Sequence, residues 1–331
     1  ELENASLVAE MYGTDHNEYI VKPTDIDELE KIMFFYDEPF ADSSAIPTYF
    51  VSKFAGEHVK VAFSGDGGDE IFAGYGNYKA DKIIQYLNKF PLVTKNKFVQ
   101  SIINLLPIGK NSFSFTNQLK KLYKILLLDP ELAHVFWLSI ISENDKNKLY
   151  INDNMLNLNK ISSLEYYRKY FDHYKNKDFI NTCILTDIKT VLPDDYLTKV
   201  DRASMANSVE VRVPFLDHKL VEYCSNLPSK YKMQGFETKS LLKQIMKDKL
   251  PKQIISGKKK GFSIPLNKWF KQDFNSLFEK YLSIEEIKSQ GLFNHKFINE
   301  LINNHSYGKV DSSKSLWSII AFQIWYKNYY E

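Results

Sequence analysis

Residues 1–75 alternate between helical and strand patterns of apolar positions. The spacing predicts helices at residues 4–11, 24–35 and 43–54, and short apolar runs predict strands at residues 18–21 and 59–63. Strands separated by helices of this length are typical of a parallel, doubly wound α/β sheet. Two strands are few for such a sheet, so we expect either that the chain begins inside a domain or that other strands are hidden in the pattern.

From residue 71 onward the pattern is helical almost to the end. The spacing predicts an irregular segment at residues 92–114 and helices at residues 79–88, 118–128, 130–139, 164–174, 179–191, 239–249 and 315–327. We therefore expect a short α/β part at residues 1–78, followed by a mostly helical part at residues 79–331. No apolar run reaches the ~18 residues that a membrane-spanning helix needs, so we expect no membrane partner.

The composition is that of a globular protein with a sizeable core. Of the 331 residues, 44% are hydrophobic and 25% are charged, which excludes a disordered chain, a collagen and a coiled coil. The formal net charge is only +2, so no excess of basic residues favours nucleic acid as a partner. The two cysteines, Cys183 and Cys224, cannot build a disulfide framework and are typical of a reducing compartment, so we expect a cytoplasmic protein.

Glycines gather directly after the strand predicted at residues 59–63. Five of the 13 glycines lie within residues 65–76, and we call residues 64–70 the glycine loop. A glycine-rich turn between a strand and a helix points bare backbone N–H groups at one spot, as phosphate-binding loops do. The loop also carries three carboxylates, and carboxylates beside a phosphate generally need a bridging cation such as Mg²⁺. The alternative is a tight turn followed by a capped helix start.

Arginine is scarce in this chain. Among the 43 basic residues only Arg168, Arg202 and Arg212 are arginines, and two of them lie close together in the sequence. The planar fork of arginine makes bidentate contacts that lysine cannot replace. Either a lysine-biased composition leaves these arginines by chance, or Arg202 and Arg212 make such contacts.

Five segments of the chain carry motifs that belong together. They are residues 37–49, 64–70 (Ser-Gly-Asp-Gly-Gly-Asp-Glu), 194–206, 210–217 and 259–266. In this order they resemble the synthetase domain of glutamine-dependent, class B asparagine synthetases, and the resemblance covers most of the chain. It implies an ATP-pyrophosphatase-type α/β fold, of the adenine nucleotide alpha hydrolase kind, with a parallel sheet and a large all-helical extension.

The resemblance also implies a reaction with ATP and Mg²⁺ as cofactors. ATP would adenylate the side-chain carboxylate of aspartate with release of pyrophosphate, and ammonia from glutamine would then displace AMP to give asparagine. Two alternatives stay open. One is an amidotransferase that acts on the carboxylate of a sugar, a peptide or a β-lactam precursor, although Asp66 argues against a β-lactam synthetase. The other is a nucleotide-binding module without catalysis.

Two departures from the family pattern affect this expectation. The Ser-Gly-Gly-x-Asp-Ser loop that normally opens the synthetase domain does not occur, and the chain begins with Glu1 instead of the cysteine nucleophile of a glutaminase domain. The resemblance therefore implies an N-terminally truncated domain that cannot complete its ATP site alone. It also implies a glutaminase domain upstream in the full-length chain, and a homodimer is a candidate assembly.

Within the glycine loop, the resemblance assigns roles residue by residue. Ser64, Gly65 and Gly67 would contact ATP, and Asp69 would be a Mg²⁺ ligand. Asp66 would be a catalytic residue that accepts a proton from the attacking ammonia. The alternative for Asp66 is a side chain that only stabilises the turn.

Outside the loop, the resemblance assigns roles to Lys259 and to the helix expected at residues 194–206. Lys259 would be catalytic and would bind ATP, because a fixed cation stabilises negative charge on the α-phosphate and pyrophosphate. Its alternative is a solvated basic turn. Lys199, Arg202 and Asp195 would hold the substrate, or would simply form ion pairs.

Two further pairs of residues are weaker candidates. Glu210 and Arg212 are expected to form a structural ion pair that fixes the turn at residues 213–215. Asp42 and Ser43, at a helix start, are candidate contacts to a substrate or an interface.

Overall fold

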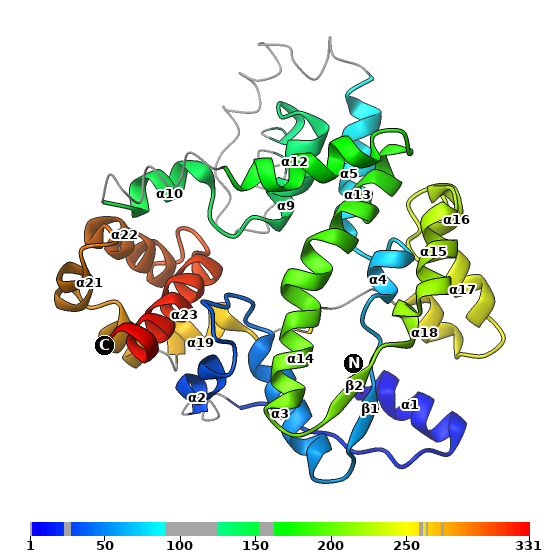
Figure 1. Ribbon diagram of the computed structural model, residues 1–331, viewed down its shortest axis with the longest axis horizontal. Coiled ribbons are helices and arrows are strands. Elements are labelled where there is room, and N and C mark those ends of the chain that lie inside the picture. Colours follow the sequence, from blue (N-terminus) through cyan, green and yellow to red (C-terminus); the bar gives the residue numbers. More distant parts are fainter. Residues whose placement is uncertain are drawn as a thin grey trace. The chain divides into compact units, whose positions relative to one another are not determined.

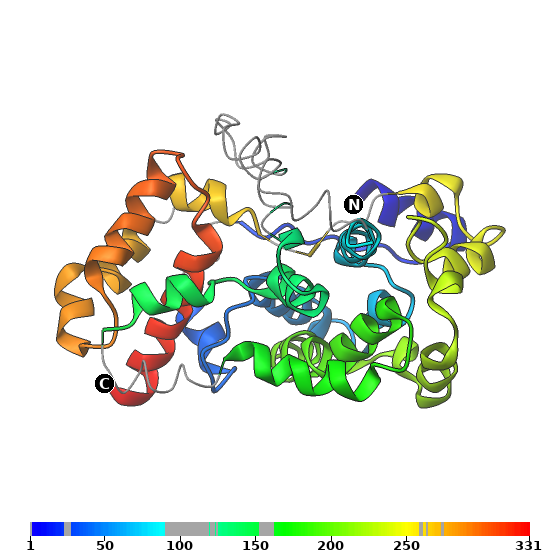
Figure 2. The same ribbon diagram turned by 90° about the horizontal axis from the view of Figure 1, so that it is seen from above.

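The computed structural model describes residues 2–22, 28–89, 119, 123, 125–151, 162–257, 261–262, 264–272 and 275–331 (Figures 1 and 2). These residues form two compact units, each built from segments that are far apart in the sequence. Unit 1 consists of Glu1–Glu28, Ser44–Lys79 and Tyr170–Ile264. Unit 2 consists of Leu29–Ser43, Ala80–Lys169 and Pro265–Glu331.

Unit 1 combines short helices with one small sheet. Strands β1 (Val61–Phe63) and β2 (Glu210–Arg212) run parallel, with Val61 paired to Glu210 and Phe63 paired to Arg212. The helices of this unit are α1 (Leu2–Tyr12), α3 (Ala45–Gly56), α4 (Gly68–Ile71), α13 (Phe179–Lys189), the π-helix η2 (Leu192–Leu197), α14 (Thr198–Met205), the 3-10 helix η3 (Pro214–Leu216), α15 (His218–Asn226), α16 (Ser229–Lys232), α17 (Ser240–Met246) and α18 (Lys252–Ser256). Helix α14 packs against α3 and β2 (Figure 1).

The core of unit 1 lies directly behind the glycine loop. Ile71 and Phe72, which follow the loop, pack with Cys224 of α15, and Phe215 and Leu241 close the cluster. Helix α13 contacts α4, and its residues 180–187 are all buried. The short helix α4 is therefore held in place by apolar packing.

Unit 2 is helical and is centred on its C-terminal helix. Its helices are α2 (Leu29–Phe34), α9 (Pro130–Leu138), α10 (Glu143–Leu149), α19 (Leu266–Gln272), α20 (Asn275–Tyr281), α21 (Ile284–Gln290), α22 (His295–Ser306) and α23 (Ser313–Tyr330), while α5 (Gly76–Leu87) and α12 (Ser163–Tyr174) contain residues of both units. Helix α23 contacts α2, α19, α20 and α22, and Figure 2 shows α22 and α23 side by side. Trp317 and Ile320, both on α23, are buried. In the described part of the chain, no helix has both the length and the apolar character needed to cross a membrane.

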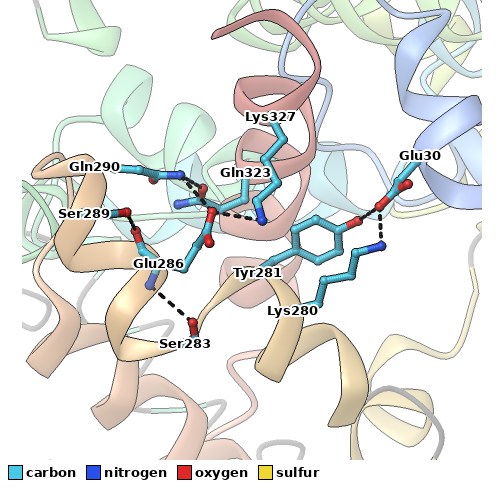
Figure 3. A network of polar contacts seen from close by, with 9 residues as sticks. All are labelled: Glu30, Lys280, Tyr281, Ser283, Glu286, Ser289, Gln290, Gln323 and Lys327. Atoms are coloured by element: carbon cyan, nitrogen blue, oxygen red, sulfur yellow. Dashed lines mark hydrogen bonds and ion pairs between the residues drawn. The ribbon is translucent and has the colours of Figure 1, made fainter. Parts of the chain in front are cut away.

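Polar contacts tie α2 and α20 together within unit 2 (Figure 3). The hydroxyl of Tyr281 donates to the Glu30 carboxylate, and Lys280 Nζ lies 2.5 Å from the same oxygen. The hydrogen bonds from Lys280 and Tyr281 lower the pKa of Glu30. The ring of Tyr281 is itself buried, so this contact anchors a core side chain at its polar end.

A second set of contacts joins α21 to α23 (Figure 3). Lys327 Nζ lies 3.0 Å from the Glu286 carboxylate, and the amide of Gln290 donates to Oε1 of Gln323 at 2.7 Å. Gln323 is fully buried, so its hydrogen bond offsets the cost of removing an amide from water. These contacts fix which turn of α21 faces which turn of α23.

The structure confirms the coarse expectation of a mostly helical chain with a small parallel sheet. The strand predicted at residues 59–63 is present as β1. The strand predicted at residues 18–21 is wrong, because residues 14–22 have no regular secondary structure. There Tyr19 stacks on Phe50 of α3 with ring centroids 6.0 Å apart, so its apolar character serves side-chain packing.

Most of the predicted helices are confirmed with ends that differ by at most three residues: α1, α3, α5, α9, α12, α13, α17 and α23. The described end of the helix predicted at residues 24–35 is α2, and residues 24–27 lie outside the described residues. The segment predicted to be irregular, residues 92–114, also lies outside them. In the helix predicted at residues 118–128, the described residues 119, 123, 125 and 126 are helical.

Lys232 of α16 is a buried lysine in unit 1, with only 1% of its surface exposed. Its ammonium donates to Oδ1 of Asn181 at 2.8 Å, and the amide of Asn181 donates in turn to Asp178 at 2.8 Å. Burial lowers the pKa of Lys232 from 10.5 to about 8. The folded protein therefore releases this proton at a lower pH than the unfolded chain does.

The depressed pKa of Lys232 predicts a pH-dependent stability. Between pH 8 and 10.5 the unfolded chain binds more protons, so the free energy of unfolding rises with pH, by up to roughly 3 kcal/mol, and this gain is lost as pH falls through 8. Lys232→Met should remove this rise in guanidinium unfolding curves at pH 7.5 and pH 10. Lys230→Met, at an exposed position of the same helix, is the control. An unchanged pH slope in Lys232→Met would contradict the assignment.

Candidate functional site

The glycine loop begins where β1 ends and runs into α4 (Figure 1). The backbone N–H of Ser64 donates to the carbonyl oxygen of Arg212 at 2.9 Å, which extends the β1–β2 ladder by one bond. The N–H of Gly68 donates to the carbonyl oxygen of Gly65 at 3.3 Å, and this turn leads into α4. The loop therefore lies at the carboxyl end of a parallel strand, where open α/β sheets bind ligands.

Two glycines of the loop press against the segment after β2. Gly67 has a φ of +82°, and a Cβ at this position would lie 2.2 Å from Cδ2 of Leu216. A Cβ at Gly68 would lie 3.1 Å from the ring of Phe215. Gly65 differs, because it is exposed and no heavy atom lies within 4 Å of its Cβ position. The loop is thus held tightly at Gly67 and is open at Gly65.

Asp66 and Ser64 hold each other within the loop. The hydroxyl of Ser64 donates to Oδ2 of Asp66 at 2.6 Å, and the backbone N–H of Asp66 lies 3.4 Å from the same hydroxyl. Both side chains are half-buried. This contact is of the turn-stabilising kind, and it also fixes a carboxylate at the open side of the loop, next to Gly65.

Asp69 forms an ion pair with a residue that sequence reasoning missed. Oδ1 of Asp69 lies 2.9 Å from Nζ of Lys239, just before α17. The pair sits over Gly74, where a Cβ would lie 1.9 Å from Oδ1 of Asp69. No motif in the sequence marks Lys239, because its approach to Asp69 depends on a contact between distant segments.

Glu70 is turned into the protein, unlike Asp66 and Asp69. It is 1% exposed, and the hydroxyl of Tyr75 donates to its carboxylate at 2.5 Å. Burial raises the pKa of Glu70, and the hydrogen bond from Tyr75 opposes that shift. Nearby, the hydroxyl of Tyr78 donates to Asp187 of α13 at 2.6 Å. Tyr75 and Tyr78 therefore donate hydrogen bonds to two buried carboxylates, those of Glu70 and Asp187.

The predicted substrate residues lie on η2 and α14. Lys199 is buried, and its ammonium donates to the hydroxyl of Ser44 at 2.7 Å and lies 4.9 Å from the ring centroid of Tyr196. Asp195 is half-buried on η2. Arg202 is exposed on α14, so the two cations of this helix do not share one environment.

A line of aromatic contacts connects this group to the glycine loop. The ring of Tyr196 lies 5.9 Å from that of Tyr75, whose hydroxyl binds Glu70. Lys199 on one side and Glu70 on the other are thus linked through two packed tyrosines. Such a line keeps the buried end of α14 and the start of α4 in one arrangement.

Three other predictions have different outcomes. The expected ion pair is confirmed, with Nε of Arg212 2.8 Å from Glu210, but both side chains are more than half exposed, so the pair contributes little stability. Lys259 lies outside the described residues. Asp42 and Ser43 precede α3 and belong to unit 2, and Ser44 next to them is the residue that Lys199 binds.

Comparison with known proteins identifies the family. A family model described as "Asparagine synthase" matches residues 1–327. The chain belongs to the asparagine synthase family. The resemblance carried by the five motifs is therefore confirmed, and the family is one of ATP-dependent amidotransferases.

Three relatives show how far the similarity extends. The asparagine synthetase [glutamine-hydrolyzing] 1 of Bacillus subtilis is 29% identical over 327 residues, which cover 98% of this chain and 50% of that protein. A putative asparagine synthetase [glutamine-hydrolyzing] of Mycobacterium tuberculosis is 27% identical over 347 residues, covering 100% of this chain and 49% of that protein. The amidase ChyE of Penicillium rubens is 24% identical over 250 residues, covering 70% of this chain and 36% of that protein. The chain spans about half the length of the first two.

The residues of the loop fit the groups that an asparagine synthase domain would hold. Phosphates need backbone that they can approach, and Gly65 is exposed with open space around it. Mg²⁺ needs carboxylate oxygens with some access to solvent, and Asp69 is 22% exposed. Glu70 does not fit this role, because its carboxylate is buried and bound to Tyr75.

The packing at Gly67 predicts that alanine at this position lowers the stability of the protein. Gly67→Ala should lower the free energy of unfolding by roughly 1–3 kcal/mol, because alanine disfavours a positive φ and its methyl group would strike Leu216. Gly65→Ala, in the same loop, should stay within about 0.5 kcal/mol of the parent. Urea unfolding of the three proteins measures this. Equal stability of the two variants would contradict the packing.

Proposed function

We propose that this chain supplies the synthetase residues of an asparagine synthetase, whose reaction the full-length protein carries out. ATP adenylates the side-chain carboxylate of aspartate and releases pyrophosphate, and ammonia then attacks the acyl carbon and displaces AMP. The observation that carries the proposal is the glycine loop at the carboxyl end of β1, with one open glycine and two accessible carboxylates, in a chain that belongs to this family.

ATP is proposed to bind along the glycine loop. Ser64, Gly65 and Gly67 contact it, with Gly65 as the open position. Gly67 also fixes the path of the loop, because its backbone is already packed on Leu216. A rigid loop presents its N–H groups without reorganisation when the nucleotide binds.

Asp69 is proposed to hold the Mg²⁺. When bound, the ion would neutralise charge on the phosphates as they separate. Asp69 keeps its place through Lys239 and through the backbone of α4, so its carboxylate stays at the loop while ligands exchange.

Asp66 and Lys259 are proposed as the catalytic residues. Asp66 takes up the proton that ammonia loses when it attacks, and Ser64 orients the carboxylate for this by donating to Oδ2. Lys259 places a fixed positive charge at the α-phosphate and pyrophosphate, which favours the departure of both leaving groups.

Lys199, Arg202 and Asp195 are proposed to hold aspartate. Two cations suit the two carboxylates of aspartate, and an acidic side chain suits its ammonium group. The buried hydrogen bond from Lys199 to Ser44 supports a fixed position for one cation. The exposed position of Arg202 leaves it able to contact a ligand that arrives from solvent.

Glutamine is the proposed source of ammonia. The two asparagine synthetases compared above are named as glutamine-hydrolysing, and this chain matches about half of each. We therefore propose that a glutaminase domain outside the matched half supplies ammonia to the glycine loop.

A second candidate is an amidotransferase that acts on a different carboxylate. The relative ChyE is named an amidase, so proteins similar to this chain carry other names, and this favours a test of other acceptors. Pyrophosphate release with aspartate, compared with release on sugar acids and peptides, separates the two candidates.

The proposed roles of Asp69 and Asp66 predict that their variants depend on magnesium in different ways. Asp69→Asn should raise the Mg²⁺ concentration for half-maximal pyrophosphate release by roughly 10–100-fold or more, the range seen when even an outer partner of a metal ligand is lost. Asp66→Asn should leave that concentration unchanged and slow asparagine formation by about 10²–10⁴-fold. A magnesium titration of both variants, made in the full-length protein, measures this.

Two controls accompany the titration. Circular dichroism shows whether each isosteric variant keeps its fold, and Asp217→Asn, at the start of α15, changes a carboxylate outside the proposed site. A parent-like magnesium curve for Asp69→Asn would mean that Asp69 serves only its ion pair with Lys239.

A further inference from the structure

Lys239 and Asp69 form an ion pair that is built into the glycine loop. Nζ of Lys239 lies 2.9 Å from Oδ1 of Asp69, and the two side chains are only 29% and 22% exposed. A partly sheltered pair of this kind is screened less by salt than a surface pair. The carboxylate proposed to hold Mg²⁺ therefore already has a positive charge against it.

Gly74 provides the space for this pair. A Cβ at Gly74 would lie 1.9 Å from Oδ1 of Asp69 and 2.4 Å from Cε of Lys239. The φ of Gly74 is not in the left-handed region, so the backbone conformation does not require glycine. The absence of a side chain at this position is what allows the carboxylate and the lysine to meet.

Two residues beside the pair, Ala73 and Lys239, have backbones in the left-handed region. Lys239 has a φ of +55°, which is unfavourable for lysine, and its N–H donates to the carbonyl oxygen of Phe72 at 3.2 Å. Ala73 also has a φ of +55°, and the N–H of Gly74 donates to the carbonyl oxygen of Asp69 at 2.7 Å. Strained residues that persist in a folded protein cluster at functional sites.

A lysine held against a metal ligand changes what can bind there. A free divalent cation approaching Asp69 would meet the ammonium of Lys239, and the repulsion opposes binding. The phosphates of a nucleotide add negative charge and reverse that balance. Removing Lys239 would leave Asp69 without this countercharge and open to a free cation.

We propose that Lys239 is a positioning residue that keeps free Mg²⁺ out of the glycine loop, so that the metal enters only together with a nucleotide. This rests on the proposed function of Asp69 as the metal ligand. It adds an order of binding, in which the loop accepts the metal–nucleotide complex and not the free metal. It also assigns roles to Gly74 and Lys239, which lie outside the five motifs named above.

Binding of Mn²⁺, used as a paramagnetic probe for Mg²⁺, tests the proposal without any turnover. Free Mn²⁺ is measured by electron paramagnetic resonance in titrations of this chain without nucleotide. Lys239→Met should bind Mn²⁺ at least about ten-fold more tightly than the parent, the scale on which outer partners affect a metal ligand. The double variant Asp69→Asn/Lys239→Met should lose that gain, because the gain depends on the exposed carboxylate.

A neighbouring lysine provides the matched control. Lys243→Met removes a lysine of α17 that pairs with Glu237 at 3.1 Å, and it should leave Mn²⁺ binding as in the parent. Circular dichroism checks the fold of each variant, and Lys239→Gln replaces Lys239→Met if the latter does not fold. Equal Mn²⁺ affinity of parent and folded Lys239 variant would overturn the proposal. So would tight, Asp69-dependent Mn²⁺ binding by the parent without nucleotide.

A second titration separates this proposal from the proposed function. In the full-length protein with ATP present, the parent should bind Mn²⁺, and Asp69→Asn should weaken that binding about ten-fold or more. If Asp69→Asn binds Mn²⁺ and ATP like the parent, the role of Asp69 as the nucleotide's metal ligand is wrong. The nucleotide-free comparison of Lys239→Met with the parent decides the exclusion of free metal by itself.

Discussion

The pairing of β1 with β2 is the contact on which the proposed site depends. It joins residues 61–63 to residues 210–212, and its last bond, from the N–H of Ser64 to Arg212, fixes the first residue of the glycine loop. The segment after β2 then supplies Leu216, against which Gly67 packs. Without this parallel pairing, the loop would have neither a fixed start nor a surface to rest on.

The polar groups around the loop separate into buried and accessible ones. Glu70 is bound by Tyr75 and removed from solvent, whereas Asp66 and Asp69 stay half-buried with Ser64 and Lys239 as partners. Three carboxylates within five residues thus have three environments. Each environment is set by the residue that the fold places next to the carboxylate. The chemistry proposed for each residue follows from its access to solvent and from its fixed partner.

The sequence predicts the loop well, because glycines, carboxylates and an apolar run are all local signals. It does not predict β2, whose Glu-Val-Arg has one apolar residue, and it misplaces a strand at residues 18–21, where Tyr19 packs on a helix. The sequence also does not predict the contacts of Lys239 and Ser44. Ser44 lies 155 residues from its partner Lys199, and Lys239 meets Asp69 over Gly74, after a long stretch of chain. The roles of the site residues and the boundary after residue 78 stay predictions.

The transfer of oxygen from aspartate to AMP tests the central claim most directly. If the side-chain carboxylate attacks the α-phosphate of ATP and ammonia later displaces AMP, one carboxylate oxygen leaves with AMP. With the full-length protein, aspartate labelled with ¹⁸O in its side-chain carboxylate should therefore give AMP that carries one ¹⁸O atom by mass spectrometry, together with asparagine that keeps the other. Formation of ADP and labelled inorganic phosphate, or AMP without label, would contradict the account.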